Sequence, residues 1–397
     1  MQIFVRPGDS ITTYSELFQI PHSLIIDSNP FVIPNMLKVG ETIQIPGYLC
    51  VYQTIQSKTS LAQIAAQHNL HLNALLITNP QLHSTQLQIG QVITVPIRIT
   101  ERIVNGNQHY DYETMLKDLR LLQHIYPFLK YNSIGCSVLN REIPELIIGT
   151  GQNNIHFNAS FHANEWITTP IVMTFLNDYL LALTNNYPIR DVPMLQQYLH
   201  TTLSIVPMVN PDGVNLVLNG LPLDKNIRAK LLAWNKGSTD FSGWKANCNG
   251  VDLNDQFPAD WEDERANHPK SPGPRDYGGE HPLTEPEAIS IAKLTERVDF
   301  SRIIALHTQG EVIYWGYKGL EPPQAEQIVN EMARVSGYEP VQNVESYAGY
   351  RDWFIQQWRR PGFTVELGLG KNPLPISQFG EIYERSLGIF LAALYCE

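Results

Sequence analysis

Cysteine is scarce in this chain of 397 residues, and its four cysteines stand far apart in the sequence. They are Cys50, Cys136, Cys248 and Cys396, and no two of them form a CxxC pair. Cysteine metal sites and disulfide-stapled domains both depend on closely and regularly spaced cysteines. We therefore expect four reduced thiols, and neither a cysteine metal site nor a disulfide framework.

Basic residues are also few, because Lys and Arg number 28 against 39 Asp and Glu, which gives a formal net charge of −11. Proteins that bind nucleic acid through its phosphates carry clustered Lys and Arg, and anionic membrane surfaces attract polybasic segments. The composition therefore predicts neither nucleic acid nor membrane as a partner. No apolar run approaches the roughly 18 residues that a transmembrane helix needs, so we expect no membrane span.

The N-terminus lacks the pattern of a secretory signal, since Met1 to Ser10 contain no basic segment followed by an apolar stretch. Such a pattern is what marks a leader peptide, so we expect a cytoplasmic protein. What the chain does have is enough length for two or three domains. Its 43% hydrophobic and 17% charged residues form an ordinary globular balance.

The first hundred residues contain an internal repeat at a constant offset. Asn29-Pro30 recurs as Asn79-Pro80, and Val39 to Pro46 recurs as Ile89 to Pro96. Self-similarity at a fixed period indicates two copies of one structural unit. We place the copies at residues 1–47 and 49–97.

Each copy has the pattern of a short strand, two helices that run up to Asn-Pro, and a closing strand that ends at proline. Ile3 to Val5 and Val51 to Ile55 are the opening strands, and Ser60 to Gln67 is an amphipathic helix. This βααβ unit, a small α+β domain, resembles the LysM domain. The resemblance implies binding of the glycan strands of peptidoglycan in a shallow groove beside the Asn-Pro turn. A spacer or a dimerisation module is the alternative.

Residues 98–108 are polar and form a linker to a second domain, which we place at residues 109–397. Here apolar, β-rich runs alternate with helical ones, the pattern of an α/β fold with a mixed, largely parallel sheet flanked by helices. The predicted helices include Thr169 to Leu183 and Thr284 to Arg297, the second opening with a capping box of Thr284 and Glu287. The predicted strands are Glu145 to Ile148, Ile155 to Phe161, Thr202 to Val209, Arg302 to His307 and Phe363 to Glu366.

Three of these strands lead into residues that can hold a metal or move a proton. His162 and Glu165 follow the strand that ends at Phe161, His307 ends another, and Glu366 ends a third. In such folds the functional sites lie beyond the carboxyl ends of the strands. Two imidazoles and one carboxylate are the ligand set of a catalytic zinc that keeps an open fourth position. Taken singly, each of these residues is also compatible with a structural histidine or a solvated acid.

The surrounding motifs extend this pattern along the chain, and together they resemble the zinc carboxypeptidase (M14) family over residues 108–397. The resemblance implies one zinc ion per chain, held by His162, Glu165 and His307. It also implies that Glu366 is the general base that takes a proton from the attacking water and passes it to the leaving amine. The motifs, in chain order, are Tyr131 to Ser137, His162 to Glu165, Asn210 to Gly213, Gly250 to Asn254, Ala305 to His307 and Thr364 to Leu367.

Two departures from the family pattern concern the substrate. The family usually has an oxyanion-assisting arginine before Gly-Val-Asp, and Lys245 is the implied substitute here, with an exposed surface lysine as the alternative. The family also holds a terminal carboxylate with an Asn-Arg pair, whereas this chain has Asn254-Asp255, and the Asp255 carboxylate would repel that group. A substrate ammonium is its natural partner instead. Tyr347, Tyr350 and Arg351 are further candidates for substrate binding, Arg351 with a structural salt bridge as the alternative.

The tandem repeats, Asn254 to Pro258 and the run Phe161 to Trp166 together resemble the γ-D-glutamyl-L-diamino acid endopeptidase I family of sporulating bacilli. The resemblance implies cleavage of peptidoglycan stem peptides (muropeptides) between γ-D-glutamate and diaminopimelate, in the cytoplasm of a sporulating cell or in the spore. Diaminopimelate and lysine stay open as the diamino acid. A general zinc carboxypeptidase and a catalytically silent peptidoglycan-binding protein are the alternatives.

Overall fold

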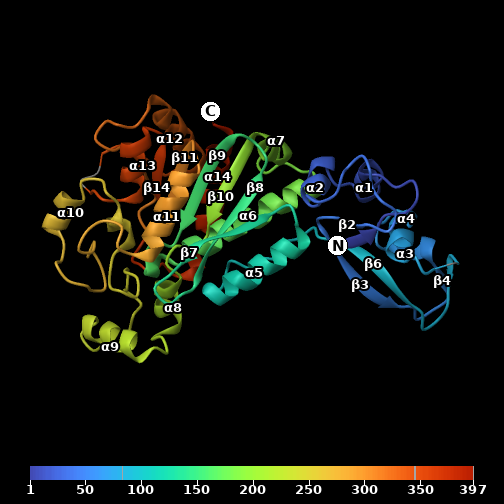
Figure 1. The fold of residues 1–397 in the computed structure, drawn as a ribbon, viewed down its shortest axis with the longest axis horizontal. Coiled ribbons are helices and arrows are strands. Elements are labelled where there is room, and N and C mark those ends of the chain that lie inside the picture. The colour runs from blue at the N-terminus through green and yellow to red at the C-terminus, as the bar shows by residue number, and fades with distance from the viewer. Residues whose placement is uncertain (83, 344–345, 397) are drawn as a thin grey trace. The chain divides into compact units, whose positions relative to one another are not determined.

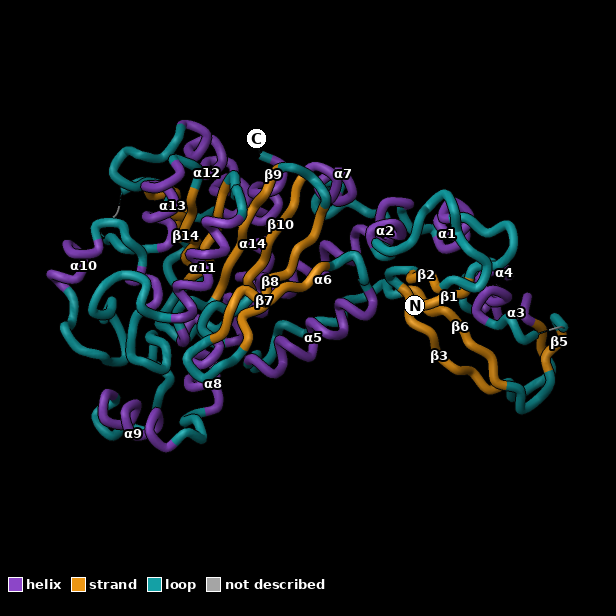
Figure 2. The backbone as a smooth tube through the Cα atoms, viewed as in Figure 1, coloured by secondary structure: helices purple, strands orange, loops and turns teal. Residues whose placement is uncertain are grey.

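The structure is a computed structural model that describes residues 1–82, 84–343 and 346–396. The chain forms two compact units, which Figures 1 and 2 show as ribbon and tube. The predicted domain boundaries remain predictions, because each unit combines segments that lie far apart in the sequence and so does not correspond to one continuous stretch of chain. The first unit comprises Met1–Ile103, Asp118–Lys130 and Asn177–Leu195, and the second Val104–Lys117, Tyr131–Leu176 and Gln196–Glu397.

Both repeats in the first unit have the predicted βααβ order. In each copy, two strands pair antiparallel and the two helices lie between them in the sequence. The paired strands are β1 and β2 in the first copy and β3 and β6 in the second. The second copy has an additional short pair, β4 and β5. The elements are β1 (Gln2–Phe4), α1 (Ile11–Phe18), α2 (His22–Asp27), β2 (Thr42–Gln44), β3 (Tyr48–Thr54), β4 (Thr59–Ser60), α3 (Leu61–Gln67), α4 (Leu72–Thr78), β5 (Gln86–Leu87) and β6 (Val92–Arg98).

The asparagine of each recurring Asn-Pro pair joins a helix and a strand of its own repeat by hydrogen bonds. The Asn79 side chain donates to the carbonyl oxygens of Leu75 (2.8 Å) and Thr94 (2.6 Å) and accepts from the Thr94 N–H (2.7 Å). Asn29 makes the same three contacts with Ile25 and Gln44 in the first copy. Each asparagine therefore ties the end of the second helix to the closing strand. Since both side chains are buried, the amides that made the repeat visible in the sequence are structural.

The second unit is built on an eight-stranded sheet with the order β13-β12-β14-β11-β9-β10-β8-β7. The central strands β14, β11, β9 and β10 run parallel, while β8 and β12 pair antiparallel with their neighbours β10 and β14. This confirms the mixed, largely parallel sheet. The strands are β7 (Lys130–Cys136), β8 (Glu142–Gly149), β9 (Asn153–Ala159), β10 (Thr201–Val206), β11 (Arg302–His307), β12 (Val312–Tyr314), β13 (Glu339–Val341) and β14 (Gly362–Glu366).

Helices cover both faces of this sheet, as an α/β layer architecture requires. On one face, Ile303 and Ala305 of β11 pack in one core cluster with residues of α11 (Pro286–Arg297) and α13 (Tyr350–Trp358). On the other face, Phe157 of β9 packs against aromatic rings of α6 (Thr168–Asn185) and α14 (Phe379–Tyr395). The remaining helices are α5 (Tyr112–Ile125), α7 (Met194–His200), α8 (Pro211–Asn219), α9 (Lys225–Trp234), α10 (Trp261–Asn267) and α12 (Pro323–Ser336).

Two sequence predictions about helices are wrong in detail. The predicted capping box does not form, because α11 begins at Pro286 and the Thr284 hydroxyl bonds to the Gln256 side chain instead. Glu287 lies fully buried and accepts from the Val138 N–H. In addition, one stretch of 23 residues, Ala163–Asn185, is long and apolar enough to cross a membrane. Since 94% of its apolar window is buried inside the protein, it has the character of a core helix.

Candidate metal centre

The predicted site residues meet at one edge of the central sheet. β14, β11 and β9 are consecutive in the sheet and parallel, so their carboxyl ends lie side by side. His307 and Glu366 are register partners at the ends of β11 and β14. β9 ends at Ala159, where Ser160 takes a left-handed conformation (φ 51°) and turns the chain. The turn leads to His162 and the short 3-10 helix η1 (Ala163–Glu165).

Hydroxyl groups fix this turn. The Thr168 hydroxyl accepts from the Ser160 N–H (2.9 Å) and donates to the Glu165 carbonyl oxygen (2.8 Å). The Ser160 hydroxyl also lies 2.8 Å from that of Thr169. All of these groups are buried, so their bonds hold the turn in place with little competition from water. The turn in turn sets the directions of His162 and Glu165.

His162, Glu165 and His307 bring their ligand atoms together in the protein interior. Nδ1 of His162 lies 2.9 Å from Oε1 of Glu165, and Nδ1 of His307 lies 3.0 Å from Oε2. The two Nδ1 atoms are 3.1 Å apart. Ligand atoms bound to one tetrahedral zinc at about 2.0–2.2 Å are separated by roughly 3.3 Å. The donor set and its spacing therefore fit a zinc ion.

The electrostatics of the three side chains also fit a cation. Burial lowers the pKa of His162, but the carboxylates of Glu165 and Asp252 outweigh it and raise that pKa to about 9. Burial opposes ionisation of Glu165, yet the two histidines lower its pKa to about 2. Burial lowers the pKa of His307. A pocket that keeps a carboxylate charged and draws a proton onto a buried imidazole favours positive charge.

A second layer of contacts orients the ligands. Nε2 of His162 lies 3.1 Å from Oδ1 of Asp252, which is fully buried. The other oxygen of Asp252 lies 2.7 Å from Nζ of Lys245. Carboxylates that bind the far nitrogen of a ligating histidine fix its tautomer and its ring orientation. Lys245 is therefore no exposed surface lysine: it neutralises Asp252, and its predicted oxyanion role stays a prediction.

Glu165 is oriented by the segment after β11 and by Asn372. The Thr308 N–H donates to Oε2 of Glu165 (3.2 Å), and the Asn372 side chain donates to Oε1 (3.4 Å). Asn372 also donates to the Thr308 carbonyl oxygen (2.8 Å). Each carboxylate oxygen of Glu165 thus has a hydrogen-bond donor in addition to its histidine neighbour.

Glu366 stands beside the ligand cluster as the general-base candidate. Burial and the like charge of Glu165 raise the pKa of Glu366 to about 8, while His162, Lys245 and Arg351 oppose that shift. A carboxylate with a pKa near neutrality can both accept and return a proton at physiological pH. Glu366 is the register partner of His307, so this acid ends its strand next to a predicted zinc ligand, and its role as general base stays a prediction.

Asp255 lies in the 3-10 helix η2 (Leu253–Gln256) and faces an imidazole. Its Oδ2 lies 3.2 Å from Nδ1 of His268, and Nε2 of His268 lies 3.4 Å from Oε1 of Glu264. Burial and the neighbouring Asp252 raise the pKa of Asp255. The hydrogen bond to Asp255 raises the pKa of His268. Two carboxylates thus share one imidazole, an arrangement that favours additional positive charge.

The remaining predicted substrate residues have partners of their own. Arg351 is buried and pairs with the adjacent Asp352, and the Asn254 side-chain oxygen accepts from the Tyr350 N–H (3.4 Å). Tyr347 is half-buried, and its N–H donates to Glu264. Tyr350 is completely buried in the core, where its hydroxyl bonds to that of Thr295 (2.8 Å). Its burial argues against the predicted substrate contact of Tyr350.

Comparison with known sequences identifies the fold around this centre. The profile of the zinc carboxypeptidase family matches residues 115–387, and that of the LysM domain matches residues 4–46 and 54–96. The chain belongs to the zinc carboxypeptidase family. The His162/Glu165/His307 cluster is the candidate metal site of this zinc peptidase, which carries two LysM domains ahead of its catalytic domain.

Two relatives show how far the similarity extends. Gamma-D-glutamyl-L-diamino acid endopeptidase 1 of Lysinibacillus sphaericus is 61% identical over 395 residues, which cover 100% of both chains. The uncharacterized protein YqgT of Bacillus subtilis is 44% identical over 304 residues, covering 75% of this chain and 81% of YqgT.

Two solved structures share the fold at low sequence identity. Thrombin activatable fibrinolysis inhibitor (TAFI) has a TM-score of 0.58 and 17% identity, and the match covers 78% of this chain and 88% of that one. Carboxypeptidase A of Helicoverpa armigera has a TM-score of 0.55 and 18% identity, and it covers 84% and 81%. These likenesses confirm the carboxypeptidase-like fold of the zinc peptidase.

Several residues of the site have no role in the sequence prediction. Asp252 lies in a motif that carries the family resemblance, so its position was visible although its contact with His162 was not. Thr308 follows a predicted ligand directly, which is a weak signal. Asn372 and His268 had no sequence signal: Asn372 reaches the site from a loop far along the chain, and His268 lies at the end of α10, 13 residues after Asp255.

Proposed function

We propose that this zinc peptidase hydrolyses the amide bond between γ-D-glutamate and a diamino acid, meso-diaminopimelate, in peptidoglycan stem peptides. The observation that carries the proposal is the buried Asp255 carboxylate, at the position where the family pattern has an arginine for a terminal carboxylate. The relative from Lysinibacillus sphaericus, named for this bond, supports it over the full chain length.

Zinc, one ion per chain in this proposal, would be held by His162, Glu165 and His307 and supplies Lewis acidity, which polarises a carbonyl and acidifies water. The protein's own contribution to the reaction begins with Glu366. Its carboxylate accepts a proton from the attacking water and returns it to the nitrogen of the leaving amine. Asp252 and Lys245 hold His162 in the orientation described above. Thr308 and Asn372 do the same for Glu165.

Asp255 supplies the preference for a diamino acid. Asp255 and Glu264 flank the imidazole of His268, and burial and the neighbouring Asp252 raise the pKa of Asp255, so a further cation beside Asp255 is favoured. A buried carboxylate of this kind stabilises an ammonium group and destabilises a carboxylate at the same place. The second amino group of diaminopimelate or lysine is such an ammonium.

The LysM repeats have the targeting role in this proposal: they bind the glycan strands of peptidoglycan and bring the catalytic domain to its stem peptides. A cytoplasmic or spore-associated location in a sporulating cell remains a prediction, which microscopy of a fluorescent fusion during sporulation can test.

The experiment that tests the function is incubation of the full chain with L-Ala-γ-D-Glu-meso-diaminopimelate and with the lysine analogue, followed by mass spectrometry of the products. We expect L-Ala-D-Glu and the free diamino acid. An ordinary acetylated dipeptide is the comparison substrate. If the ordinary dipeptide is cleaved faster than both muropeptides, the protein is a general carboxypeptidase. If the protein cleaves none of the three but binds peptidoglycan, it is a binding protein.

A further inference from the structure

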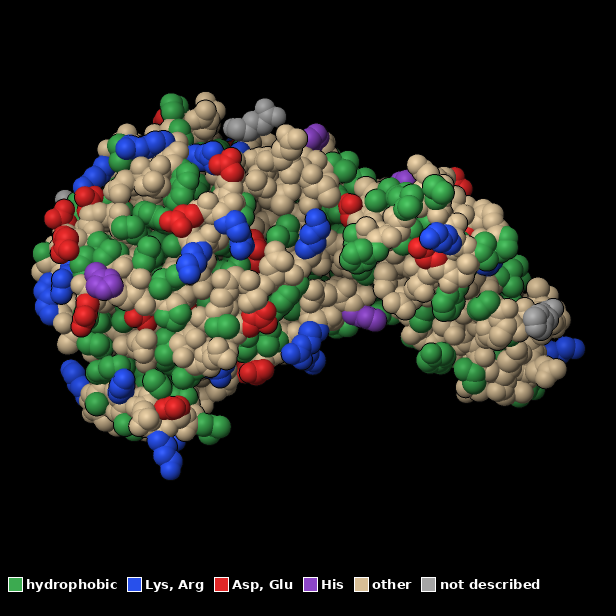
Figure 3. Space-filling view, in the orientation of Figure 1, with side chains coloured by type: hydrophobic (Ala, Val, Ile, Leu, Met, Phe, Trp, Pro, Cys, Tyr) green, Lys and Arg blue, Asp and Glu red, His purple; other side chains and the backbone are tan. Residues whose placement is uncertain are grey.

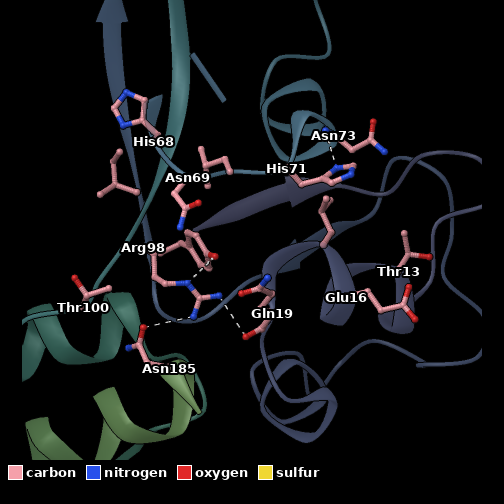
Figure 4. Close-up of a pocket in the computed structure, with 14 residues that line it drawn as sticks. Thr13, Glu16, Gln19, His68, Asn69, His71, Asn73, Arg98, Thr100 and Asn185 are labelled. Atoms are coloured by element: carbon pink, nitrogen blue, oxygen red, sulfur yellow. Dashed lines mark hydrogen bonds between the residues drawn. The ribbon is translucent and has the colours of Figure 1, made fainter. Parts of the chain in front are cut away.

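Metal-ligating side chains converge at two places in the part of the chain that the structure describes. One is the candidate zinc centre, and the other consists of Asp255, Glu264 and His268, which form the Asp255 cluster. A cleft of about 820 Å³ in the first unit is also lined by two histidines, His68 and His71 (Figure 4), but these do not belong to such a group. Among the described residues, the Asp255 cluster is therefore the one further set of ligands for a metal ion.

The Asp255 cluster lies next to the candidate zinc centre. Asp255 belongs to η2, whose N-cap residue Asp252 contacts the predicted zinc ligand His162 at 3.1 Å. Glu264 lies in α10, and His268 is the residue at the end of that helix. Both carboxylates are buried, while the His268 side chain is 27% exposed. The imidazole therefore borders solvent, from which an ion can reach the two acids.

The ligand atoms of the Asp255 cluster are close enough to share one ion. Nδ1 of His268 lies 3.2 Å from Oδ2 of Asp255, and Nε2 lies 3.4 Å from Oε1 of Glu264. One ligand atom from each residue lies within 4.8 Å of the other two, whereas ligands of one zinc are separated by roughly 3.3 Å. Closing the three side chains onto one ion therefore needs movements of about 1 Å.

The backbone holds Glu264 in a position suited to this role. The Tyr347 N–H donates to Oε2 of Glu264 at 2.8 Å. This bond fixes one carboxylate oxygen and leaves the other, Oε1, facing the imidazole of His268. Because the anchor is a backbone group, it is retained when the Glu264 side chain is changed to glutamine.

The charges of the Asp255 cluster favour a cation. Burial and the like charge of Asp252 raise the pKa of Asp255, and burial raises the pKa of Glu264. The neighbouring Lys245 opposes the shift of Asp255, but its Nζ lies 2.7 Å from Asp252. A metal ion between the two acids would therefore stabilise their charged forms. By contrast, acidic and basic side chains are interspersed on the face of the protein that Figure 3 shows, which offers a cation no broad acidic patch.

We propose that the Asp255 cluster is a second metal site, which binds Zn²⁺ through two carboxylates and one imidazole nitrogen when zinc is in excess, and that zinc bound there inhibits the enzyme. Imidazole with carboxylates suits zinc, whereas Mg²⁺ and Ca²⁺ prefer oxygen ligands. The inhibition rests on the proposed function, because zinc and the second ammonium of the substrate then compete for the Asp255 carboxylate.

The first test counts bound zinc by equilibrium dialysis of the full chain and atomic absorption. The wild type should bind a second zinc equivalent more weakly than the first. Glu264→Gln and His268→Asn should keep the first equivalent, which also shows that they are folded. Each should bind the second at least about a hundredfold more weakly, because a direct ligand contributes more than the tenfold to hundredfold of a residue that only orients one.

Two control variants match these changes. Glu262→Gln replaces an exposed glutamate of the same helix, α10, and His281→Asn replaces an exposed histidine outside the cluster. Both should bind two equivalents like the wild type. A wild type that binds a single equivalent overturns the second site, and so do cluster variants that bind the second equivalent as tightly as the wild type.

The second test measures hydrolysis of the diaminopimelate tripeptide as zinc is added. Zinc should raise the KM of the wild type, and Glu264→Gln should need at least about tenfold more zinc for the same effect. If the second equivalent binds without inhibition, or if wild type and Glu264→Gln are inhibited alike, the competition at Asp255 is wrong although the metal site stands. The proposed function fails by a different result, the absence of tripeptide cleavage before any zinc is added in excess.

Discussion

Nε2 of His162 lies 3.1 Å from a carboxylate oxygen of Asp252, so a buried acid holds the far side of a predicted metal ligand. The second oxygen of Asp252 contacts Lys245 at 2.7 Å. An ion pair and a hydrogen-bond contact therefore link three side chains in a row that ends at the metal centre: Lys245, Asp252 and His162. Lysine at this position gives the acid a half-buried counter-ion. Burial raises the pKa of Asp252, but Lys245 and His162 lower it well below its usual range and keep the carboxylate ionised.

The first prediction concerns the linked side chains of Lys245, Asp252 and His162. Asp252→Asn should weaken zinc binding by about tenfold to a hundredfold, because the amide favours the Nε2–H tautomer of His162 less than the carboxylate does and removes the closer of the two carboxylates beside Lys245. Competition with a chelating dye measures the affinity. Asp276→Asn is the control, since Asp276 contacts Lys245 at 3.4 Å but does not contact His162. Equal zinc affinities for wild type and Asp252→Asn would contradict the orienting role.

The second prediction separates metal binding from proton transfer. Glu366→Gln should retain the fold and one zinc ion per chain but lose at least about a hundredfold in kcat, because an amide cannot accept a proton from water. Zinc content by atomic absorption and turnover of the tripeptide are the two measurements. Near-normal kcat in this variant would remove Glu366 from the role of general base.

The sequence predicted the parts of this site that follow from strand order. His162, Glu165, His307 and Glu366 could be found because parallel strands carry their functional residues at one edge. The turn at Ser160, which sets the directions of His162 and Glu165, is not predicted by the sequence. A serine in a left-handed conformation has no sequence signature as strong as that of glycine.

The sequence predicted side-chain partners less well. Arg351 was a substrate candidate, but its partner is the next residue, Asp352, and the choice between neighbour and substrate depends on burial. Tyr350 is a predicted substrate residue, yet it lies in the core beside Phe161 and Phe257. The partner of such a side chain depends on which face of its helix is covered by the rest of the protein. The sequence alone does not determine that face.

The third prediction tests the substrate preference. Asp255→Ala should reduce cleavage of substrates with a second ammonium by about 2–5 kcal/mol in transition-state stabilisation, with a smaller loss if the ammonium stays partly solvated. Analogues that lack this ammonium should lose much less. The measurement is kcat/KM for the diaminopimelate tripeptide and for its analogue with an aliphatic residue. Equal losses on both substrates would mean that Asp255 shapes the site without binding the amine.

The fourth prediction concerns pH and His268, whose folded-state pKa is raised above the ordinary value of 6.5 by its bond to Asp255. The folded state therefore holds this proton more tightly than the unfolded state does. The resulting stabilisation is fully present below pH 6.5 and is lost as the pH rises through the higher folded-state pKa. The charged groups that face His268, namely Asp255, Glu264 and Asp276, all act in the same direction.

His268→Asn should accordingly be less stable than the wild type at pH 5.5, and the difference should shrink by pH 9. Urea unfolding at both pH values measures the free energy of unfolding. His200→Asn, at an exposed histidine of α7, is the matched control for the replacement of a histidine by asparagine. A His268→Asn deficit that is as large at pH 9 as at pH 5.5 would show that the imidazole acts by packing alone, and the charge assigned to the Asp255 cluster would then need revision.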